Sequence, residues 1–319
     1  MTVNLLLSYA YHAKTDLAHA KGSIHCGRLM IDSGAFSAHS VGKKISLDEY
    51  AEYLEHWEGF YDHAVTLDVI GDPAASKKNT AKLHARGLPV MPVFTRGESV
   101  KEFDAMVRDV GYVCVGGGVG MSVKQVTRRA ALLQRRAESL GGGIHALGIG
   151  STRMLRAARP YSADSSNISG SLAFGKLYFF DGTNLQNVNA NEREKMNRHR
   201  LPLTEAGFDL DYFFKHGRIP KGNENRIRIA TRSAIGAAAS AEYLRNRYHV
   251  PAPDQTEDDD GHHTYLAVAG DWSAESVFRA SALIHSDDPP KTWQRYGQKH
   301  SCKFLPTPSK EEETTHAGR

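Results

Sequence analysis

Short apolar runs alternate along the chain with longer segments in which apolar residues recur at helical spacing. The runs have the length and composition of buried strands and lie at residues 3–9, 28–31, 64–70, 88–94, 112–115, 144–147, 160–163 and 176–180. Eight strands separated mostly by helices are typical of a parallel barrel. The pattern therefore predicts an α/β fold, a (β/α)8 TIM-like barrel with a C-terminal helical extension.

Several helix starts are marked by a capping box, in which a Ser and a Glu or Gln three residues later satisfy each other's free backbone amides. The pairs are Ser46 with Glu49, Ser99 with Glu102 and Ser122 with Gln125. Another helix is predicted from Asp72, with Pro73 in its first turn, to near Gly87. Further helices are predicted at 225–249 and 272–284.

The same pattern divides the chain into three parts. Residues 1–190 are predicted to form the core of the barrel and to carry its candidate catalytic acids. Residues 191–306 are predicted to be a helical, basic part that closes the barrel, and residues 307–319 a disordered tail.

Composition narrows the class of protein. The 319 residues are enough for one large α/β domain, and no apolar run approaches the roughly 18 residues needed to cross a bilayer. The N-terminal apolar run is too short for a secretion signal, so a cytoplasmic protein is expected. Cys26, Cys114 and Cys302 lack metal-binding spacing, so they are expected to be free thiols, and no metal and no other cofactor is predicted.

Charge is distributed unevenly over the chain. The net charge is +4, and residues 191–250 hold more Lys and Arg than Asp and Glu. Such a surface suits a phosphate backbone, although a solvated helix face of mixed charge remains the alternative. The candidate phosphate-binding residues are Arg193, Arg198, Arg200, Lys221, Arg226, Arg228 and Arg232. His262 and His263 follow an acidic run and are interpreted as part of a mobile loop rather than as metal ligands.

Three acids stand at the ends of predicted strands, each followed by a loop. They are Asp32, Asp68 and Asp164. In a (β/α) barrel the carboxyl ends of all strands meet at one mouth, so these positions indicate an active site built on carboxylates. Taken alone, each Asp also fits a turn or a helix cap.

A glycine run, Gly116 to Gly118 and Gly120, follows the strand at 112–115. It does not match a dinucleotide-binding loop, because Met121 stands where the last glycine is required. The run either lets backbone amides approach a flat or anionic ligand or forms a tight loop.

Five motifs in order resemble the tRNA-guanine transglycosylase family. They are Asp-Ser-Gly-Ala-Phe-Ser from Asp32, Leu67-Asp68, the glycine run, His145-Ala-Leu-Gly-Ile-Gly, and Ser162-Ala-Asp164-Ser. The match covers residues from about 1 to about 182. It is nearest to the shorter, phage-type branch of the family, the 7-deazaguanine DNA transglycosylases. The resemblance implies exchange of guanine in DNA for a 7-deazaguanine such as preQ0, with tRNA as the alternative polymer.

The resemblance also implies residue roles. Asp164 would be the nucleophile that forms a covalent deoxyribosyl intermediate, and Asp32 would be the general acid and base. Asp68 would recognise guanine by accepting its hydrogen bonds. Two carboxyl groups in these roles are what displacement at a sugar C1′ requires. The other residues implied to contact the base are Ser33, Gly34, Phe36, Gly117, Gly118 and His145. A lone His on an apolar strand such as His145 is more often a core residue.

Three departures from the family separate this chain from the tRNA enzymes. Cys302 is the only cysteine in the C-terminal third, so the zinc subdomain of those enzymes is not predicted. Thr95-Arg96-Gly97 stands where they have a base-contacting Gln, and Ser165-Ser-Asn-Ile replaces their Pro-Thr-Arg.

Other classes of function remain open from the sequence. A barrel lyase acting on a phosphorylated small molecule would need a Lys at a strand end, and none of the strands predicted between 64 and 163 contains one. A noncatalytic nucleic-acid-binding barrel would have no use for the three acids. Which deazaguanine is used, and the oligomeric state, stay undetermined.

Overall fold

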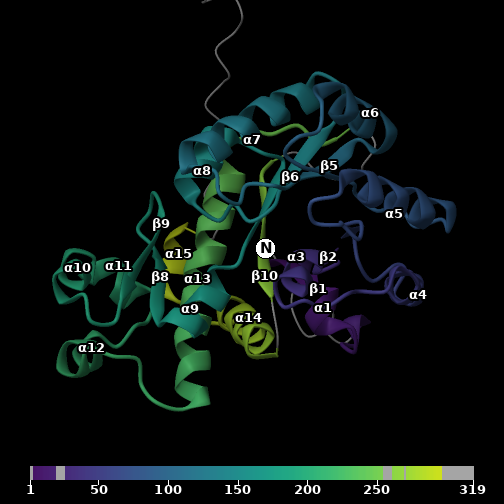
Figure 1. The fold of residues 1–319 in the computed structure, drawn as a ribbon. Coiled ribbons are helices and arrows are strands. Elements are labelled where there is room, and N and C mark those ends of the chain that lie inside the picture. Colours follow the sequence, from purple (N-terminus) through teal and green to yellow (C-terminus); the bar gives the residue numbers. More distant parts are fainter. Residues whose placement is uncertain (1–2, 19–25, 254–260, 269–270, 297–319) are drawn as a thin grey trace, which may run out of the picture.

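Eight parallel strands form a curled sheet surrounded by helices in the computed structural model, which describes residues 3–18, 26–253, 261–268 and 271–296 (Figure 1). A parallel bridge from Val65 to Met91 links the two edge strands, β3 and β4. The predicted TIM-like (β/α)8 fold is therefore confirmed. Around the sheet the strands are β3 (His63–Ala64), β2 (Cys26–Asp32), β1 (Val3–Ser8), β10 (His263–Val268), β7 (Ser162–Ser165), β6 (Gly143–Ala146), β5 (Tyr112–Val115) and β4 (Val93–Phe94).

The sequence-based prediction is wrong about one barrel strand, because that strand belongs to a different sheet. Residues 176–180 form β8 (Lys176–Phe180), which pairs antiparallel with β9 (Leu185–Asn189) in a separate hairpin. The eighth barrel position belongs to β10, which pairs with β1 and β7. A short apolar run signals a strand but carries no information about its partner, and β10 arrives only after a long helical insertion.

The interpretation of His263 as a loop residue is also wrong, whereas His262 lies in the loop directly before β10. His263 is the first residue of β10, and both side chains are buried. Both ring nitrogens of His262 are within hydrogen-bond distance of protein oxygens, the carbonyl of Pro160 at 2.7 Å and the hydroxyl of Thr264 at 2.8 Å. Burial lowers the pKa of His262 to about 4. The acidic residues 257–260 lie outside the described residues, as does the predicted tail at 307–319.

The helices begin largely where their caps predict. Ser99 and Ser122 form complete capping boxes, whereas Ser46 accepts the amide of Glu49 without the reciprocal bond. Asp72 caps the fourth predicted helix. The helices are α1 (Tyr9–His12), α3 (Ala35–Ser40), α4 (Leu47–His56), α5 (Pro73–Ala85), α6 (Val100–Val110), α7 (Val123–Glu138), α8 (Thr152–Ala158), α9 (Asn167–Phe174), α10 (Arg193–Arg198), α11 (Arg200–Glu205), α12 (Leu210–His216), α13 (Asn223–Arg247), α14 (Asp271–Ile284) and α15 (Lys291–Tyr296). In the described part of the chain no helix has the length and apolar character of a membrane span.

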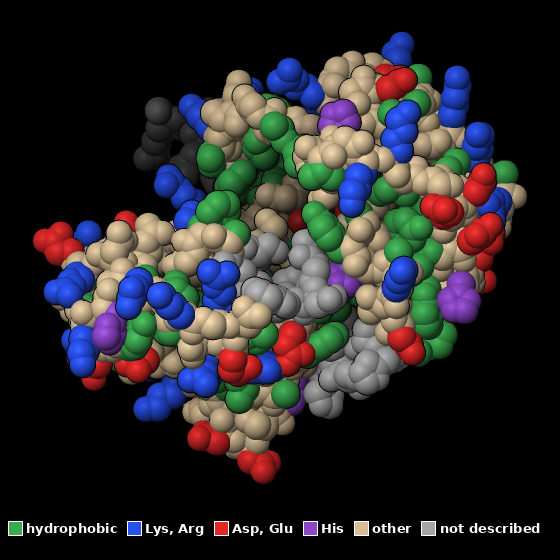
Figure 2. Space-filling view, turned by 60° about the horizontal axis from the view of Figure 1, so that its bottom comes forward, with side chains coloured by type: hydrophobic (Ala, Val, Ile, Leu, Met, Phe, Trp, Pro, Cys, Tyr) green, Lys and Arg blue, Asp and Glu red, His purple; other side chains and the backbone are tan. Residues whose placement is uncertain are grey.

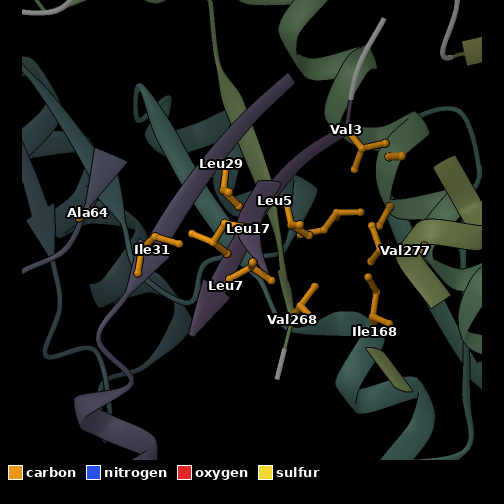
Figure 3. Close-up of a cluster of buried hydrophobic side chains, with 14 of the residues drawn as sticks. Val3, Leu5, Leu7, Leu17, Leu29, Ile31, Ala64, Ile168, Val268 and Val277 are labelled. Carbon is orange, nitrogen blue, oxygen red and sulfur yellow. The ribbon is translucent and has the colours of Figure 1, made fainter. Parts of the chain in front are cut away.

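Successive side chains of each barrel strand contribute alternately to two apolar clusters, one outside the barrel and one inside it. On β1, Leu5 and Leu7 point outward into a cluster with residues of α9 and α14, including Ile168 and Val277 (Figure 3). Leu6 belongs instead to a cluster inside the barrel, with Met30, Val65, Met91, Val93, Tyr112, Cys114, Tyr161, Val250 and Tyr265. Because successive side chains of a strand point to opposite faces, this register decides which polar residues face the barrel interior.

The long helix α13 is buried on most sides along its middle part. Its buried positions run from Ile229 to Leu244 and are mostly Ala, Ser and Gly. It passes between the barrel and the β8–β9 hairpin (Figure 1). Small side chains allow this, because they let the backbones on either side approach closely.

Gly236 is the closest of these approaches. A Cβ atom at this position would lie 2.9 Å from the Cα atom of Phe179. We expect Gly236→Ala to lower the free energy of unfolding by about 1–3 kcal/mol through overpacking. In an unobstructed helix the same change would raise it by about 1 kcal/mol. Urea denaturation measures the difference, and a more stable variant would contradict the tight contact.

Candidate active site

Strand alternation gathers a set of polar side chains inside the barrel, most of them near the carboxyl ends of the strands. Outward neighbours such as Ile31, Ile144 and Ala163 lie in the outer clusters, so the residues next to them face inward. The inward set comprises Ser8 on β1, Asp32 on β2, His145 on β6, and Ser162 and Asp164 on β7. The structure thus brings together Asp32, Asp164 and His145, three of the predicted site residues.

Asp32 ends β2 and is followed by a turn that only glycine fits. The amide of Gly34 donates to Oδ2 of Asp32 at 2.9 Å. Gly34 has a φ of 76°, and a Cβ there would lie 2.4 Å from the Cβ of Ala10 and 2.5 Å from Oγ of Ser8. The turn therefore holds the carboxylate against β1 and has no space for a side chain at position 34.

The environment of Asp32 favours its neutral form. Burial, the charge of Asp164 and the charge of Asp68 raise the pKa of Asp32 to about 6, against the opposing effects of the Gly34 amide and the Ser8 hydroxyl. A carboxyl group with a pKa near neutrality can both give and take a proton at physiological pH.

Asp164 is held in a different way. Its side chain is buried on β7, and Oδ1 accepts the amide of Gly148 at 2.7 Å. Nε2 of His145 lies 3.4 Å from the same oxygen. Gly148 belongs to the motif that begins at His145, but nothing in the motif indicates that its amide binds an acid on the next strand.

Asp68 lies after β3 and is anchored by a residue that the sequence analysis did not single out. The hydroxyl of Ser76, in the first turns of α5, donates to Oδ1 of Asp68 at 2.6 Å and accepts the amide of Val69 at 2.8 Å. Burial raises the pKa of Asp68, with a further contribution from the charge of Glu98, while Ser76 and the Val69 amide oppose the shift. Asp68 also acts on the pKa of Asp32, so the three acids share one electrostatic site.

The glycine run packs against the loop that follows β4. Gly117 has a φ of 73°, and a Cβ there would lie 2.8 Å from the backbone nitrogen of Arg96. A Cβ at Gly118 would meet only Val126, at 3.5 Å. Arg129 of α7 donates to the carbonyl of Gly116 and stacks over Phe94. The tight-loop interpretation therefore holds for Gly117, and Gly118 leaves an accessible backbone beside the mouth.

Of the remaining residues implied to contact the base, all but His145 lie in the turn after Asp32 or in the first turn of α3. Ser33 is buried, and Gly34 is the N-cap of α3. Phe36, in the first turn of α3, is 58% exposed, so its ring is available for stacking. His145 is fully buried and cannot present its side chain to solvent, unlike a residue on an open pocket wall.

Three of the predicted basic residues, Arg193, Arg198 and Arg200, lie on α10 and α11 in a lobe beside the barrel, and the other four lie just before α13 or within it. This lobe consists of β8, β9 and α10 to α12, with its own apolar core (Figure 1). Figure 2 shows the side of the molecule toward which β10 points. On this side the Lys and Arg side chains of the lobe lie among Asp and Glu side chains, beside a central hollow. Arg232 is the exception, because it packs against Gly207 and burial lowers its pKa. The exposed ones are Arg193, Arg198, Arg200, Lys221, Arg226 and Arg228.

The structure describes only some of the residues on which the cysteine and metal predictions depend. Cys114 is a free, buried thiol, whereas Cys302 and the side chain of Cys26 lie outside the described residues. Within those residues no group of three or more His, Cys, Asp or Glu side chains has the arrangement of a metal site.

The arrangement provides two carboxyl groups in different environments. Oδ1 of Asp164 accepts one backbone amide, while the pKa of Asp32 is raised to about 6. In comparisons with known proteins, no protein-family model and no curated protein matches the sequence.

Proposed function

We propose that the protein is a DNA base-exchange transglycosylase that replaces guanine with a 7-deazaguanine base such as preQ0. The observation that carries the proposal is the pairing of Asp164, whose Oδ1 accepts a backbone amide at 2.7 Å, with Asp32, whose pKa is raised to about 6. One group is suited to attack and the other to proton transfer. The resemblance to tRNA-guanine transglycosylases supplies the substrate class.

The first half-reaction removes guanine. A carboxylate oxygen of Asp164 attacks C1′ of the nucleotide, and the bond from C1′ to N9 of guanine breaks with its electron pair going to the base. Protonated Asp32 gives its proton to the departing guanine, which leaves neutral, and the deoxyribose stays esterified to Asp164. The elevated pKa of Asp32 keeps a useful fraction of it protonated near neutral pH.

The second half-reaction reverses these roles. Asp32, now ionised, takes the proton from N9 of the incoming deazaguanine, and N9 attacks C1′ while the ester bond to Asp164 breaks. Two inversions at C1′ retain the configuration of the nucleotide, and both carboxyl groups return to their starting states. No additional reactant is consumed.

Asp68 is placed to recognise the base. Its Oδ1 is held by Ser76, which fixes the carboxylate while leaving other lone pairs to accept N1–H and the exocyclic amine of guanine. A base without these donors leaves a partly buried carboxylate unpaired, which is costly. The exposed ring of Phe36 offers a stacking face beside Asp32.

The exposed basic residues of α10, α11 and the start of α13 supply the polymer contact. A base cannot reach acids inside a barrel mouth while it is paired, so the nucleotide must leave the stack at a cost of a few kcal/mol. Three carboxylates repel phosphates, and exposed cations such as Arg198 on α10 and Arg226 on α13 offset that repulsion. We expect binding to weaken steeply with salt.

Nucleoside analysis tests the proposal. We expect incubation with preQ0 to place the modified nucleoside in DNA, with guanine released in equal amount, and to leave tRNA unmodified. Polymer digestion and mass spectrometry measure both products, and Asp164→Asn protein serves as the control. Modified tRNA with unmodified DNA would overturn the choice of polymer, and no exchange in either polymer would overturn the function.

A further inference from the structure

Three buried polar side chains form a chain inside the barrel beneath Asp164. The hydroxyl groups of Tyr112 on β5 and Ser162 on β7 are hydrogen-bonded, and Ser162 Oγ lies 2.6 Å from Nδ1 of His145 on β6. All three residues are at most 2% exposed. The other ring nitrogen of His145, Nε2, has no hydrogen-bond partner among the described residues and lies 3.4 Å from Oδ1 of Asp164.

The direction of the hydrogen bonds along this chain follows from counting donors. If Tyr112 donates to Ser162 and Ser162 donates to Nδ1, each hydroxyl hydrogen has an acceptor and His145 carries its proton on Nε2, facing the carboxylate. In the reverse direction the Tyr112 hydrogen has no acceptor in the chain, and an Nε2 lone pair faces the Asp164 oxygens. Each arrangement leaves one buried donor without a hydrogen bond. In the first this donor is the Nε2–H, which lies against an oxygen of the Asp164 carboxyl group, an attractive contact, whereas in the second it is the Tyr112 hydroxyl and two electron-rich atoms face each other at Asp164. The first arrangement is therefore favoured.

The consequence for Asp164 concerns which of its oxygens attacks. The Gly148 amide and Nε2 of His145 both address Oδ1. No hydrogen bond within the described residues engages Oδ2. The carboxylate is therefore oriented through one oxygen while the other stays free.

We propose that Tyr112, Ser162 and His145 form a positioning relay for Asp164. The relay keeps the ring proton of His145 on Nε2, and this N–H faces Oδ1, which also accepts the Gly148 amide, so that Oδ2 is left as the attacking oxygen. His145 is thus a positioning residue and does not contact the base, in contrast to the role implied by the family resemblance. The inference rests on the proposed function only for the identity of Asp164 as nucleophile.

The tautomer is measurable without any substrate. Nitrogen-15 NMR of histidine-labelled protein distinguishes a protonated ring nitrogen from an unprotonated one, and the spectrum of His145→Gln protein assigns the His145 signals by their loss. We expect Nε2 protonated and Nδ1 unprotonated in the wild type. In Ser162→Ala protein, which lacks the donor to Nδ1, we expect a mixture of tautomers. A proton on Nδ1 in the wild type would overturn the relay.

Two substitutions at His145 separate positioning from mere packing. A Gln side chain carries its amide nitrogen near the place of Nε2, whereas the shorter Asn reaches only the place of Nδ1. We expect His145→Gln to form the glycosyl-enzyme within about threefold of the wild-type rate, and His145→Asn to be slower by about tenfold or more, with KM for the polymer unchanged in both. Equal losses in the two variants would mean that His145 only fills space.

The two measurements keep this inference distinct from the proposed function. If the wild type exchanges bases but carries the proton on Nδ1, the relay is wrong and the function stands. If the wild type exchanges no base while the Nε2–H tautomer is present and shifts in Ser162→Ala protein, the proposed function fails and the relay remains as a property of Asp164.

Discussion

Asp164→Asn is expected to reduce base exchange by at least about a thousandfold, roughly 4 kcal/mol in activation free energy. An amide cannot form the glycosyl ester, so the loss falls on the chemical step. Folding is preserved, because the amide oxygen of Asn still accepts the hydrogen bond from the Gly148 amide. Single-turnover release of labelled guanine from DNA measures the rate, and binding of the same DNA is expected to stay near wild type.

The control is an Asp to Asn change at an acid outside the proposed chemistry. Asp72 is exposed, lies close to Asp68 in sequence and caps α5 through the amide of Ala75. Asn is an equally good N-cap, so Asp72→Asn should leave exchange and stability unchanged. If Asp164→Asn protein keeps more than about a tenth of the wild-type rate, the nucleophile is another residue. Mass spectrometry of denatured wild type offers a second check, since the deoxyribosyl adduct should be absent from the variant.

The sequence predicted the barrel because its signals are local. Capping residues such as Ser99 and Ser122 fix helix starts, and the runs between them have strand length. Sheet membership is not local. Lys176–Phe180 and His263–Val268 are both short apolar runs, and only the packing of α13 against β8 and the pairing of β10 with β1 and β7 decide which of the two enters the barrel.

In the candidate site, too, some residues are recognisable from local sequence and others are not. Asp32 and Asp164 are recognisable because an acid at the inward position of a strand end is unusual in a buried run. Their partners are not, because Ser8, Ser76 and Ser162 are ordinary residues whose roles come from register and from contacts between elements distant in sequence. The burial of His145 reconciles its two interpretations: it is a core residue, and its core position places Nε2 beside Asp164.

Asp32→Asn is expected to stop exchange and at the same time to stabilise the protein above pH 6. The folded-state pKa of Asp32 is about 6, against an ordinary value of 3.8, so the folded protein holds this proton more tightly than the unfolded chain does. Stability therefore falls as the pH rises through the window from about 4 to about 6, because ionising the buried carboxyl favours the unfolded state. Asn carries no charge and escapes this loss.

The expected result is a difference in unfolding free energy that depends on pH. It should be small near pH 4 and reach about 3 kcal/mol in favour of Asp32→Asn at pH 7 to 8. Urea denaturation of both proteins at steps between pH 4 and pH 8 measures it, with Asp72→Asn as the variant whose difference should stay flat. A constant difference for Asp32→Asn would mean that Asp32 titrates normally and is not tuned for proton transfer.

Repeating the measurement in an Asp164→Asn background separates the two main causes of the shift. Burial is the larger cause and the charge of Asp164 the next, so removing that charge should lower the pKa of Asp32 without restoring its ordinary value. We expect the stabilisation by Asp32→Asn at pH 7 to 8 to shrink but to persist. If it disappeared, the charge of Asp164 would be the dominant cause of the raised pKa. The pKa of Asp32 would then return to its ordinary value once Asp164 is esterified by the deoxyribose. This change would favour release of the Asp32 proton in the first step and would make its recovery in the second step harder.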